Sequence, residues 1–196
     1  LNHKIKKINK VLYSHMHGDQ THGINDLRAF FINGKKRIPV YADIITSKYL
    51  YSTFKYCFKS TCAYPSILSL NKLKNKHNFF NKKKKITIKA VPVRHGNIES
   101  ICYIINNKLA YASDISSFYK NDLNLLKKID YFIVDCLWQR THAAHFNLDQ
   151  VLDIVEIIKP KKTILTNMHS DLDYNELKKI LPKNIFPGFD GMTITL

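Results

Sequence analysis

The sequence predicts an α/β layered fold, and three observations support this prediction. The chain has 196 residues and an apolar fraction of 45%, which suffices for a single domain over residues 1–196 with a real hydrophobic core. Apolar runs of strand length alternate along the chain with runs of helix length, as in proteins whose strands pack against helices. No internal repeat is visible, so a solenoid is not expected.

The N-terminal part of the chain predicts two strands, two helices and one long irregular segment. The expected strands are Lys10–Ser14 and Ile38–Ala42, and the expected helices are Thr21–Phe31 and Ser47–Phe58. Several aromatic residues of the second helix are expected in the core. Residues 59–85 show the least regular pattern and are expected to form a loop or lid.

The C-terminal part continues the alternation. Ile86–Val93 alternates as a strand does, and Pro92 predicts an edge position or a bulge. Two strands are expected to turn at Asn106-Asn107. The further elements are expected in this order: strands Ile101–Ile105 and Leu109–Ser113, helix Asp122–Lys128, buried strand Tyr131–Leu137, helix Leu148–Lys159 stopped by Pro160, strand Thr163–Met168, helix Asp173–Leu181 and strand Met192–Leu196.

A cluster of metal-ligand residue types follows the first predicted strand. His15, His17 and Asp19 occupy alternating positions, and Gly18 and Gly23 allow a tight turn. A strand that ends in such a turn directs these side chains toward one point. Imidazole and carboxylate are the ligands that zinc and manganese prefer. The spacing therefore predicts a metal site.

Three further candidate ligands also stand at the ends of predicted strands. His95 follows Val91–Arg94, Asp114 follows Leu109–Ser113, and His169 follows Ile164–Met168. Any one of them alone would be as well explained by a role in the core or beside a ligand. Side chains at strand ends can converge on one edge of a sheet, and their number and order make coincidence a poor explanation.

Taken together, these motifs resemble the metallo-β-lactamase superfamily, whose fold is an αβ/βα four-layer sandwich. The likeness is strongest to phosphodiesterases of bacterial phosphonate breakdown, which act on a phosphoribosyl 1,2-cyclic phosphate; tRNA 3′-processing endonucleases are more distant. The matching segments are His15–Asp19, Gly23–Arg28, Arg94–Gly96, Tyr111–Asp114, Thr141–Phe146, Thr166–Tyr174 and Phe189–Met192.

The resemblance implies two divalent metal ions, zinc or manganese, and a role for each matching residue. His15, His17 and His95 would hold one ion, and Asp114 would bridge the two. Asp19, His169 and the position occupied by Gln20 would hold the second ion.

The resemblance also implies a hydrolytic reaction. Two cations would share a hydroxide and direct it at phosphorus, while neutralising the phosphate oxygens. Asp19 would orient the attacking water, and His145 would donate a proton to the leaving oxygen or a hydrogen bond to the phosphoryl group. His142 is expected to be an ordinary polar loop residue. The implied function is a phosphodiesterase for a small cyclic phosphate or nucleotide-like ester.

Two departures from the family pattern leave alternatives open. Gln20 stands where the family has a histidine ligand, and its neutral amide oxygen predicts a weak second metal site. His22 is a poor substitute because it is expected to start a helix. Only fourteen residues precede His15, whereas relatives have several strands there. A degenerate, weakly active or inactive member is therefore one alternative, an RNA nuclease of the tRNA 3′-processing type a second, and a glyoxalase-type thiolesterase a distant third.

Composition sets limits on location and partners. The net charge of +16 favours anionic partners. A small phosphate ester is preferred to nucleic acid, because the run Lys82–Lys85 is better explained as a solvated loop than as a nucleic-acid patch. No segment predicts a signal peptide or a membrane span, so a cytoplasmic location without membrane contact is expected. The four cysteines are expected to be buried reduced thiols. The short N-terminus predicts an open sheet edge, at which two copies could pair as a homodimer.

Overall fold

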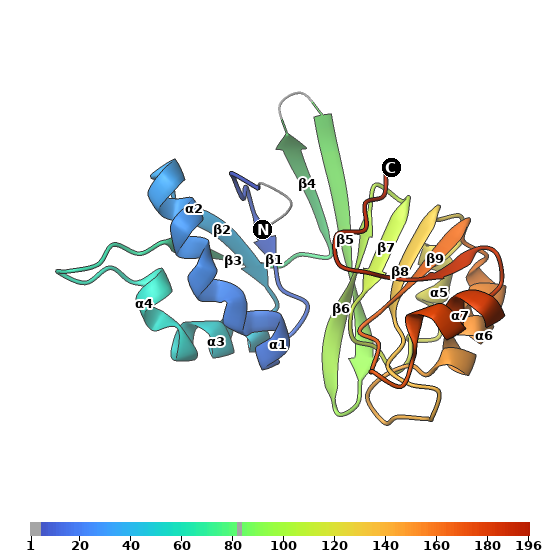
Figure 1. Ribbon diagram of the computed structural model, residues 1–196. Helices are drawn as coiled ribbons and strands as arrows, with labels where there is room; N and C mark the ends of the chain where they lie inside the picture. Colours follow the sequence, from blue (N-terminus) through green and yellow to red (C-terminus); the bar gives the residue numbers. More distant parts are fainter. Residues whose placement is uncertain (1–4, 82–83) are drawn as a thin grey trace. The chain divides into compact units, whose positions relative to one another are not determined.

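The computed structural model describes residues 5–81 and 84–196, and its contacts divide the chain into two compact units (Figure 1). Unit 1 is Leu1–Lys74 and unit 2 is Asn75–Leu196. The central lysines of the predicted basic loop, Lys82 and Lys83, lie outside the described residues.

Unit 1 is built on a small parallel sheet with the strand order β1-β2-β3. The strands are β1 (Val11–Leu12), β2 (Ile38–Ala42) and β3 (Leu68–Lys72). Ile38, Val40 and Ala42 of β2 are buried while the residues between them are half-exposed, so one face of the sheet packs into a core. The two strands that the sequence predicted in this region are confirmed in position.

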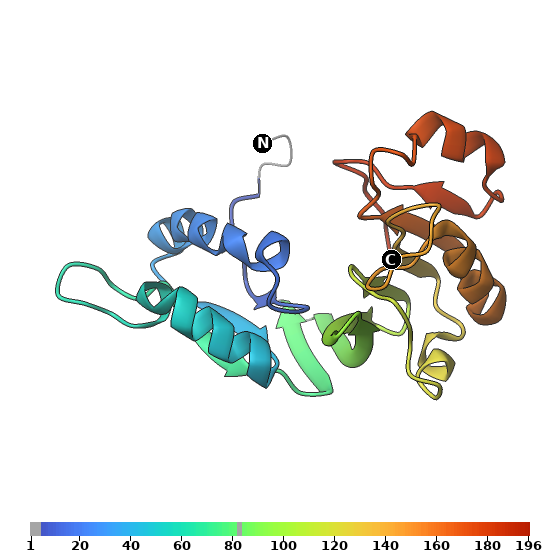
Figure 2. The same cartoon turned by 90° about the horizontal axis from the view of Figure 1, so that it is seen from below.

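The helices of unit 1 are more broken than the sequence predicts (Figure 2). They are α1 (Gly18–Thr21), the 3-10 helix η1 (His22–Asp26), α2 (Leu27–Gly34), α3 (Ile44–Thr53) and α4 (Lys55–Phe58). The single expected helix over 21–31 was wrong, because the polar stretch from His22 to Asp26 forms a 3-10 turn between two α-helices. Likewise α3 begins earlier than expected, where the Asp43 carboxylate accepts a hydrogen bond from the Thr46 amide at 2.8 Å, and a break at Phe54 separates it from α4.

Unit 2 contains a seven-stranded mixed sheet with the order β10-β9-β8-β7-β6-β5-β4. The strands are β4 (Lys76–Asn81), β5 (Lys84–His95), β6 (Ile98–Ile105), β7 (Leu109–Ala112), β8 (Tyr131–Asp135), β9 (Lys162–Thr166) and β10 (Ile185–Pro187). Helices α5 (Leu123–Leu126), α6 (Leu148–Ile158) and α7 (Tyr174–Ile180) contribute Leu126, Val151 and Leu177 to one core cluster with the buried residues of these strands.

Strand direction brings several strand ends to one edge of this sheet. Strands β7 to β10 pair in parallel, whereas β6 is antiparallel to both β5 and β7. It follows that β5 runs in the same direction as β7, and that the carboxyl ends of β5, β7, β8 and β9 lie at the same edge. In open α/β sheets, ligands bind at such an edge.

Three local predictions in unit 2 are confirmed: a turn, an edge position and the end of a helix. Asn106 and Asn107 both adopt a φ of 53°, the left-handed pair that a tight hairpin between β6 and β7 requires. Pro92 lies beyond Lys89, where the pairing of β5 with β4 ends, so the predicted edge position is confirmed. Helix α6 ends just before Lys159 and Pro160, as expected.

Two predictions about the chain's course were wrong. Residues 59–85 are not simply a loop, because they contain β3 and β4, both of which pair with partners far along the chain. No strand forms over residues 192–196; instead β10 pairs with β9, and Met192 and Ile194 line a cavity of about 440 Å³ beside Ile133 and Ile164. Alternating apolar residues thus serve to cover a sheet rather than to extend it.

The cysteines correct one expectation from composition. Cys57, Cys102 and Cys136 are buried free thiols, as expected, but Cys62 is exposed. Burial raises the pKa of the Cys57 thiol and raises the pKa of Cys102 and of Cys136 to about 12. Within the described residues, no helix has the length and apolar character needed to span a bilayer.

Candidate metal centre

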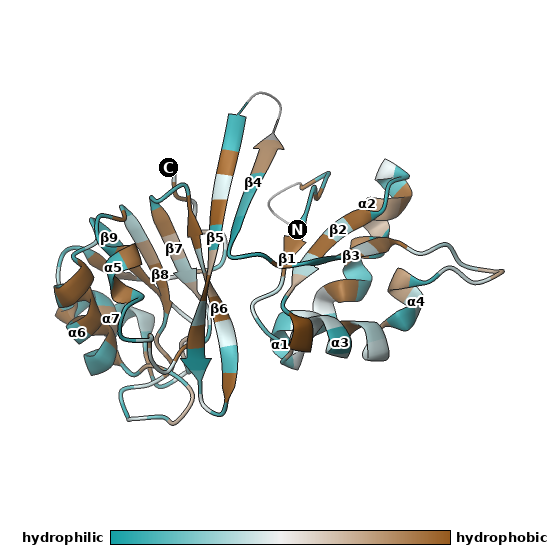
Figure 3. Ribbon diagram, turned by 180° about the vertical axis from the view of Figure 1, so that it is seen from behind, coloured by the Kyte–Doolittle hydropathy of each residue, from teal (hydrophilic) through white to brown (hydrophobic). Residues whose placement is uncertain are grey.

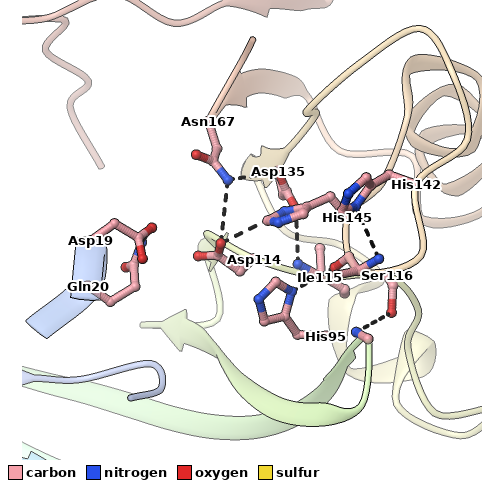
Figure 4. Close-up of polar contacts among 12 residues, drawn as sticks. Asp19, Gln20, His95, Asp114, Ile115, Ser116, Asp135, His142, His145 and Asn167 are labelled. Atoms are coloured by element: carbon pink, nitrogen blue, oxygen red, sulfur yellow. Dashed lines mark hydrogen bonds and ion pairs between the residues drawn. The ribbon is translucent and has the colours of Figure 1, made fainter. Parts of the chain in front are cut away.

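The common edge of the unit 2 sheet gathers histidines and carboxylates from separate strands (Figure 4). His95 is the last residue of β5, Asp114 follows β7, and Asp135 is the last residue of β8. His145 comes from the loop between β8 and α6. The parallel strand directions explain why residues so far apart in sequence meet here.

His95, Asp114 and His145 form the closest group of potential ligands in this unit. One ligand atom from each residue lies within 4.8 Å of the other two. His95 and Asp114 are buried, and the rings of His95 and His145 lie 4.7 Å apart at 72°. Among the described residues, Asp114 Oδ2 is buried without a hydrogen-bond partner. A buried carboxylate oxygen without a donor is costly, so a cation at this point would stabilise it.

A backbone contact fixes the His95 ring. Its Nδ1 lies 2.7 Å from the carbonyl oxygen of Ala144 and donates to it, so the neutral ring presents Nε2 as a ligand atom. The approach of this loop depends on Gly96, which has a φ of +58°. A Cβ at position 96 would lie 3.1 Å from the Ala144 Cβ. Gly96 therefore allows the contact that orients His95.

Asp135 is a buried residue that the sequence interpretation missed. His145 Nδ1 donates to Asp135 Oδ2 at 2.6 Å, and the Ile115 amide donates to the same oxygen at 3.1 Å. Burial raises the pKa of Asp135, although the hydrogen bond from His145 opposes the rise. Asp135 thus holds the His145 ring in one orientation, as carboxylates do for histidines at metal sites. In the sequence it lay inside the expected strand Tyr131–Leu137, and its only signal was that an acidic residue interrupts an apolar run.

Asn167 links the two buried carboxylates. Its Nδ2 donates to Asp135 Oδ1 at 3.2 Å and to Asp114 Oδ1 at 3.4 Å. Its backbone adopts a φ of 57°, which asparagine tolerates better than most residues and which turns the chain at the end of β9. The sequence motif around residue 167 was noted, but nothing in it indicated this bridging role.

His169 lies outside the His95–Asp114–His145 group. Its Nδ1 accepts a hydrogen bond from the Asp171 amide at 3.2 Å, and its ring lies 4.8 Å from that of Trp138. Trp138 Nε1 donates to Asp171 Oδ2 at 3.0 Å. His142, expected to be an ordinary loop residue, accepts at Nδ1 from the Ala144 amide at 3.2 Å, and its ring is 5.2 Å from that of His145.

The first motif forms a compact loop in unit 1. The rings of His15 and His17 lie 4.6 Å apart at 77°, with His15 buried and His17 exposed. The Thr21 hydroxyl donates to the His17 carbonyl at 2.8 Å and holds the loop against α1. The two imidazoles that alternation predicted to converge do lie side by side.

Asp19 and Gln20 bind each other. Gln20 Nε2 donates to Asp19 Oδ2 at 3.0 Å, and Gln20 Oε1 accepts from the Ser14 hydroxyl at 3.5 Å. Partial burial tends to raise the pKa of Asp19, but the hydrogen bond from Gln20 and the neighbouring His15 and His17 outweigh it and lower that pKa. The amide nitrogen of Gln20 therefore supplies part of the positive potential that a cation would provide.

His22, which follows Gln20 by two residues, makes contacts with α3. Its Nε2 lies 3.2 Å from the Tyr49 hydroxyl, and its ring packs edge-on against Phe54. A Cβ at Gly18 would lie 3.1 Å from this ring, so the glycine makes room for it. His22 thus belongs to the packing between η1 and α3.

The residues of unit 2 fit a divalent metal ion. Two imidazoles and one carboxylate converge, the rings of His95 and His145 are each held through Nδ1, and one buried carboxylate oxygen has no donor among the described residues. This combination of a mixed sheet with histidine and carboxylate ligands at its edge defines the class of metal-dependent hydrolases of the metallo-β-lactamase fold.

Comparison with known families agrees with this class. The model of the beta-lactamase superfamily domain matches residues 1–168, and the chain belongs to this family. No curated protein shows significant similarity to the chain.

Solved structures give the same result. A diphosphatase from the PhnP family is 29% identical, with a TM-score of 0.86 over 97% of this chain and 72% of that one. The metallo-beta-lactamase fold protein YhfI from Bacillus subtilis is 18% identical, with a TM-score of 0.67 over 92% of this chain and 74% of that one. The short form of human tRNase Z is 16% identical, with a TM-score of 0.69 over 96% of this chain and 79% of that one. The predicted superfamily fold and the likeness to the PhnP branch are confirmed.

Proposed function

We propose that this chain is a metal-dependent phosphodiesterase that hydrolyses a small cyclic phosphate or nucleotide-like ester. The observation that carries the proposal is that His95, Asp114 and His145 meet at one sheet edge, where one Asp114 oxygen is buried and has no donor among the described residues. In this proposal His95 and Asp114 are metal ligands, and His145 stays unligated so that its Nε2 can carry a proton. The 29% identity to a PhnP-family diphosphatase supports a substrate that contains a phosphoryl group. The excess of cationic residues suits an anionic substrate.

The proposed ligands follow the family pattern. His15, His17 and His95 would hold one zinc or manganese ion and Asp114 would bridge to a second, for which Asp19, Gln20 and His169 are the remaining ligands. Bound metal would supply positive charge for the phosphate oxygens and would lower the pKa of a water molecule. In this proposal the second ion is held weakly, because an amide replaces an imidazole.

His145 is the proposed proton donor. In its protonated form, Nδ1–H is committed to Asp135 at 2.6 Å, so Nε2–H is the proton available to a leaving group. As the oxygen of hydroxide bonds to phosphorus and the bond between phosphorus and the leaving oxygen breaks, the leaving oxygen takes the Nε2 proton. It becomes a hydroxyl group, which stays on the product when the substrate is cyclic. Asp135 stabilises the imidazolium before the transfer and keeps the ring oriented after it.

One observation favours a second candidate, a degenerate member with little activity. Asp19 Oδ2 accepts a hydrogen bond from Gln20 Nε2 at 3.0 Å, so this carboxylate oxygen has a donor without a cation. If this pair persists in solution, the second metal position stays empty and hydrolysis is slow.

Metal content and turnover on the same preparation test the proposal. Protein purified without chelator is analysed for metal per chain and assayed with bis(p-nitrophenyl) phosphate, a cyclic nucleotide and an RNA transcript. Turnover of the small esters that falls about a hundredfold or more in His145→Gln, but not in the control His77→Gln, is the expected result. Turnover of RNA alone would transfer the assignment to a nuclease.

The variant Gln20→His separates the two candidates. A restored imidazole should raise the metal content toward about two ions per chain, together with turnover. If the parent holds no metal and neither protein turns over any ester, the phosphodiesterase proposal is wrong and the degenerate reading stands.

A further inference from the structure

Strands β4 and β5 extend beyond the rest of the sheet as a two-stranded ribbon (Figure 1). The pairing of β5 with β6 ends at Ile88 and Ile105, whereas the pairing of β5 with β4 continues to Lys84 and Asn81. The outer part of the hairpin is therefore covered by no further strand on the β6 side. Lys76, Asn78, Phe80 and Lys85 of this hairpin are exposed, whereas Ile88 is buried.

The two faces of this ribbon differ in chemistry. Cross-strand partners share a face, and successive partners alternate between faces. One face carries the pairs Lys76–Lys89, Asn78–Thr87 and Phe80–Lys85, and the other carries His77–Ile88 and Phe79–Ile86. Figure 3 shows the resulting alternation of hydrophilic and hydrophobic bands along β5. We call the first set, Lys76, Asn78, Phe80, Lys85, Thr87 and Lys89, the ribbon face.

The ribbon face combines positive charge with an exposed aromatic ring. Lys76, Asn78 and Lys85 are exposed, and Phe80 is 69% exposed. The Thr87 hydroxyl donates to Asn78 Oδ1 at 3.0 Å, which leaves the Asn78 amide nitrogen as a donor. From residue 44 to residue 98 the sequence contains no aspartate or glutamate, so no acidic neighbour in this segment reduces the potential.

Protection of a sheet edge explains only part of this pattern. Lysines on an edge strand discourage pairing with another sheet. A phenylalanine that is 69% exposed does the opposite, because it adds an apolar, sticky group to the same edge. An aromatic ring on a face that also carries cationic side chains is instead the arrangement with which proteins bind single-stranded nucleic acid.

We propose that the ribbon face binds single-stranded nucleic acid. Lys76, Lys85 and Lys89 contact successive phosphates, and a base stacks on Phe80. Asn78 donates a hydrogen bond to a phosphate or sugar oxygen. Because no metal ligand is involved, the proposal is independent of the proposed hydrolytic function and can be tested with chelator present.

Fluorescence anisotropy with labelled single-stranded RNA and DNA of equal length, in EDTA and at several salt concentrations, measures this binding. The slope of log binding constant against log salt concentration changes by roughly 0.7 for each phosphate contact with a single strand. The triple variant K76E/K85E/K89E removes three such contacts, so the magnitude of this slope should fall by about 2. Phe80→Ala should weaken binding on the order of tenfold, while Phe80→Trp retains it. The two oligomers distinguish RNA from DNA as the source of the strand.

The matched control is the triple reversal K120E/K127E/K128E, which makes the same charge change at exposed lysines around α5. Equal losses in the control and ribbon-face variants would reduce the effect to net charge and overturn the proposal. So would equal affinity for a duplex, or stronger binding to vesicles that contain anionic lipid. Sedimentation velocity excludes a change in self-association as the cause, and the fluorescence of Trp138 and circular dichroism confirm that each variant is folded.

Discussion

Asp135 can be tested by a change of a single atom, Asp135→Asn. The carboxylate is fully buried and accepts three hydrogen bonds, from His145 Nδ1, the Ile115 amide and Asn167 Nδ2. An asparagine has one oxygen and one NH2 group. If the nitrogen replaces Oδ2 it faces two donors, and if it replaces Oδ1 it faces the Asn167 amide.

The second orientation costs less, but Asn167 cannot correct it by rotating its own amide. At present Asn167 Nδ2 donates to Asp114 Oδ1 at 3.4 Å. Rotation of the Asn167 amide would place its oxygen there instead, so that two acceptors would face each other. At least one buried donor therefore loses its acceptor, and the charge-assisted bond to His145 becomes a neutral one. We expect the free energy of unfolding to fall by about 2 kcal/mol.

Urea unfolding followed by Trp138 fluorescence measures this loss. Trp138 is the only tryptophan and lies in unit 2, so its signal reports on the unit that contains Asp135. The midpoint should fall with an unchanged m-value. The control Asp153→Asn, exposed on α6, should stay within about 0.5 kcal/mol of the parent. If the urea midpoint of Asp135→Asn equals that of the control, the three hydrogen bonds to Asp135 do not stabilise the protein and the reasoning is refuted.

Three further perturbations test the packing and the local structure. Gly188→Ala should destabilise unit 2 by about 1–3 kcal/mol, because the new Cβ would lie 2.7 Å from the Leu165 carbonyl oxygen. A Cβ at Gly34 meets open space, so the control Gly34→Ala should be neutral or slightly stabilising. Thermal melts compare the two variants. Asn147→Ala removes the capping box of α6 and should cost about 1 kcal/mol in the same melts, whereas a loss near zero would show that the cap is dispensable. At pH 8 one thiol per native chain, that of Cys62, should react rapidly with a disulfide reagent. The other three thiols are buried, and their raised pKa values keep them protonated. Two or more rapidly reacting thiols would contradict the packing.

Local patterns in the sequence were enough to predict the class of fold and most candidate ligands. The alternation of His15, His17 and Asp19 predicts a metal site from five consecutive residues, and Asn106-Asn107 predicts a turn from two. A polar residue that follows an apolar run indicated His95 and Asp114 as candidates, because the ends of strands with the same direction meet at one edge of a sheet. Such signals depend only on neighbouring residues, which is why they can be read without a structure.

The tertiary structure decided which polar groups act together. Asp135 and Asn167 lie inside the strands that the sequence predicted, and only the pairing of β7, β8 and β9 brings them to Asp114 and His145. The hydrogen bond that Gln20 donates to Asp19 likewise required side-chain geometry. Such roles depend on contacts between segments that are distant in sequence, so they cannot be predicted from a local pattern.

Pairing with distant partners also decided the least predictable elements. The alternating run from Met192 has the pattern of a strand, yet the shorter Ile185–Pro187 occupies the open edge of β9. Strands β3 and β4 emerge from a polar segment because β2 and β5 offer unpaired edges to them. The sequence by itself determined the chemistry available to this protein, whereas strand pairing determined where that chemistry is assembled, because backbone hydrogen bonds are satisfied by whichever segment reaches a free edge.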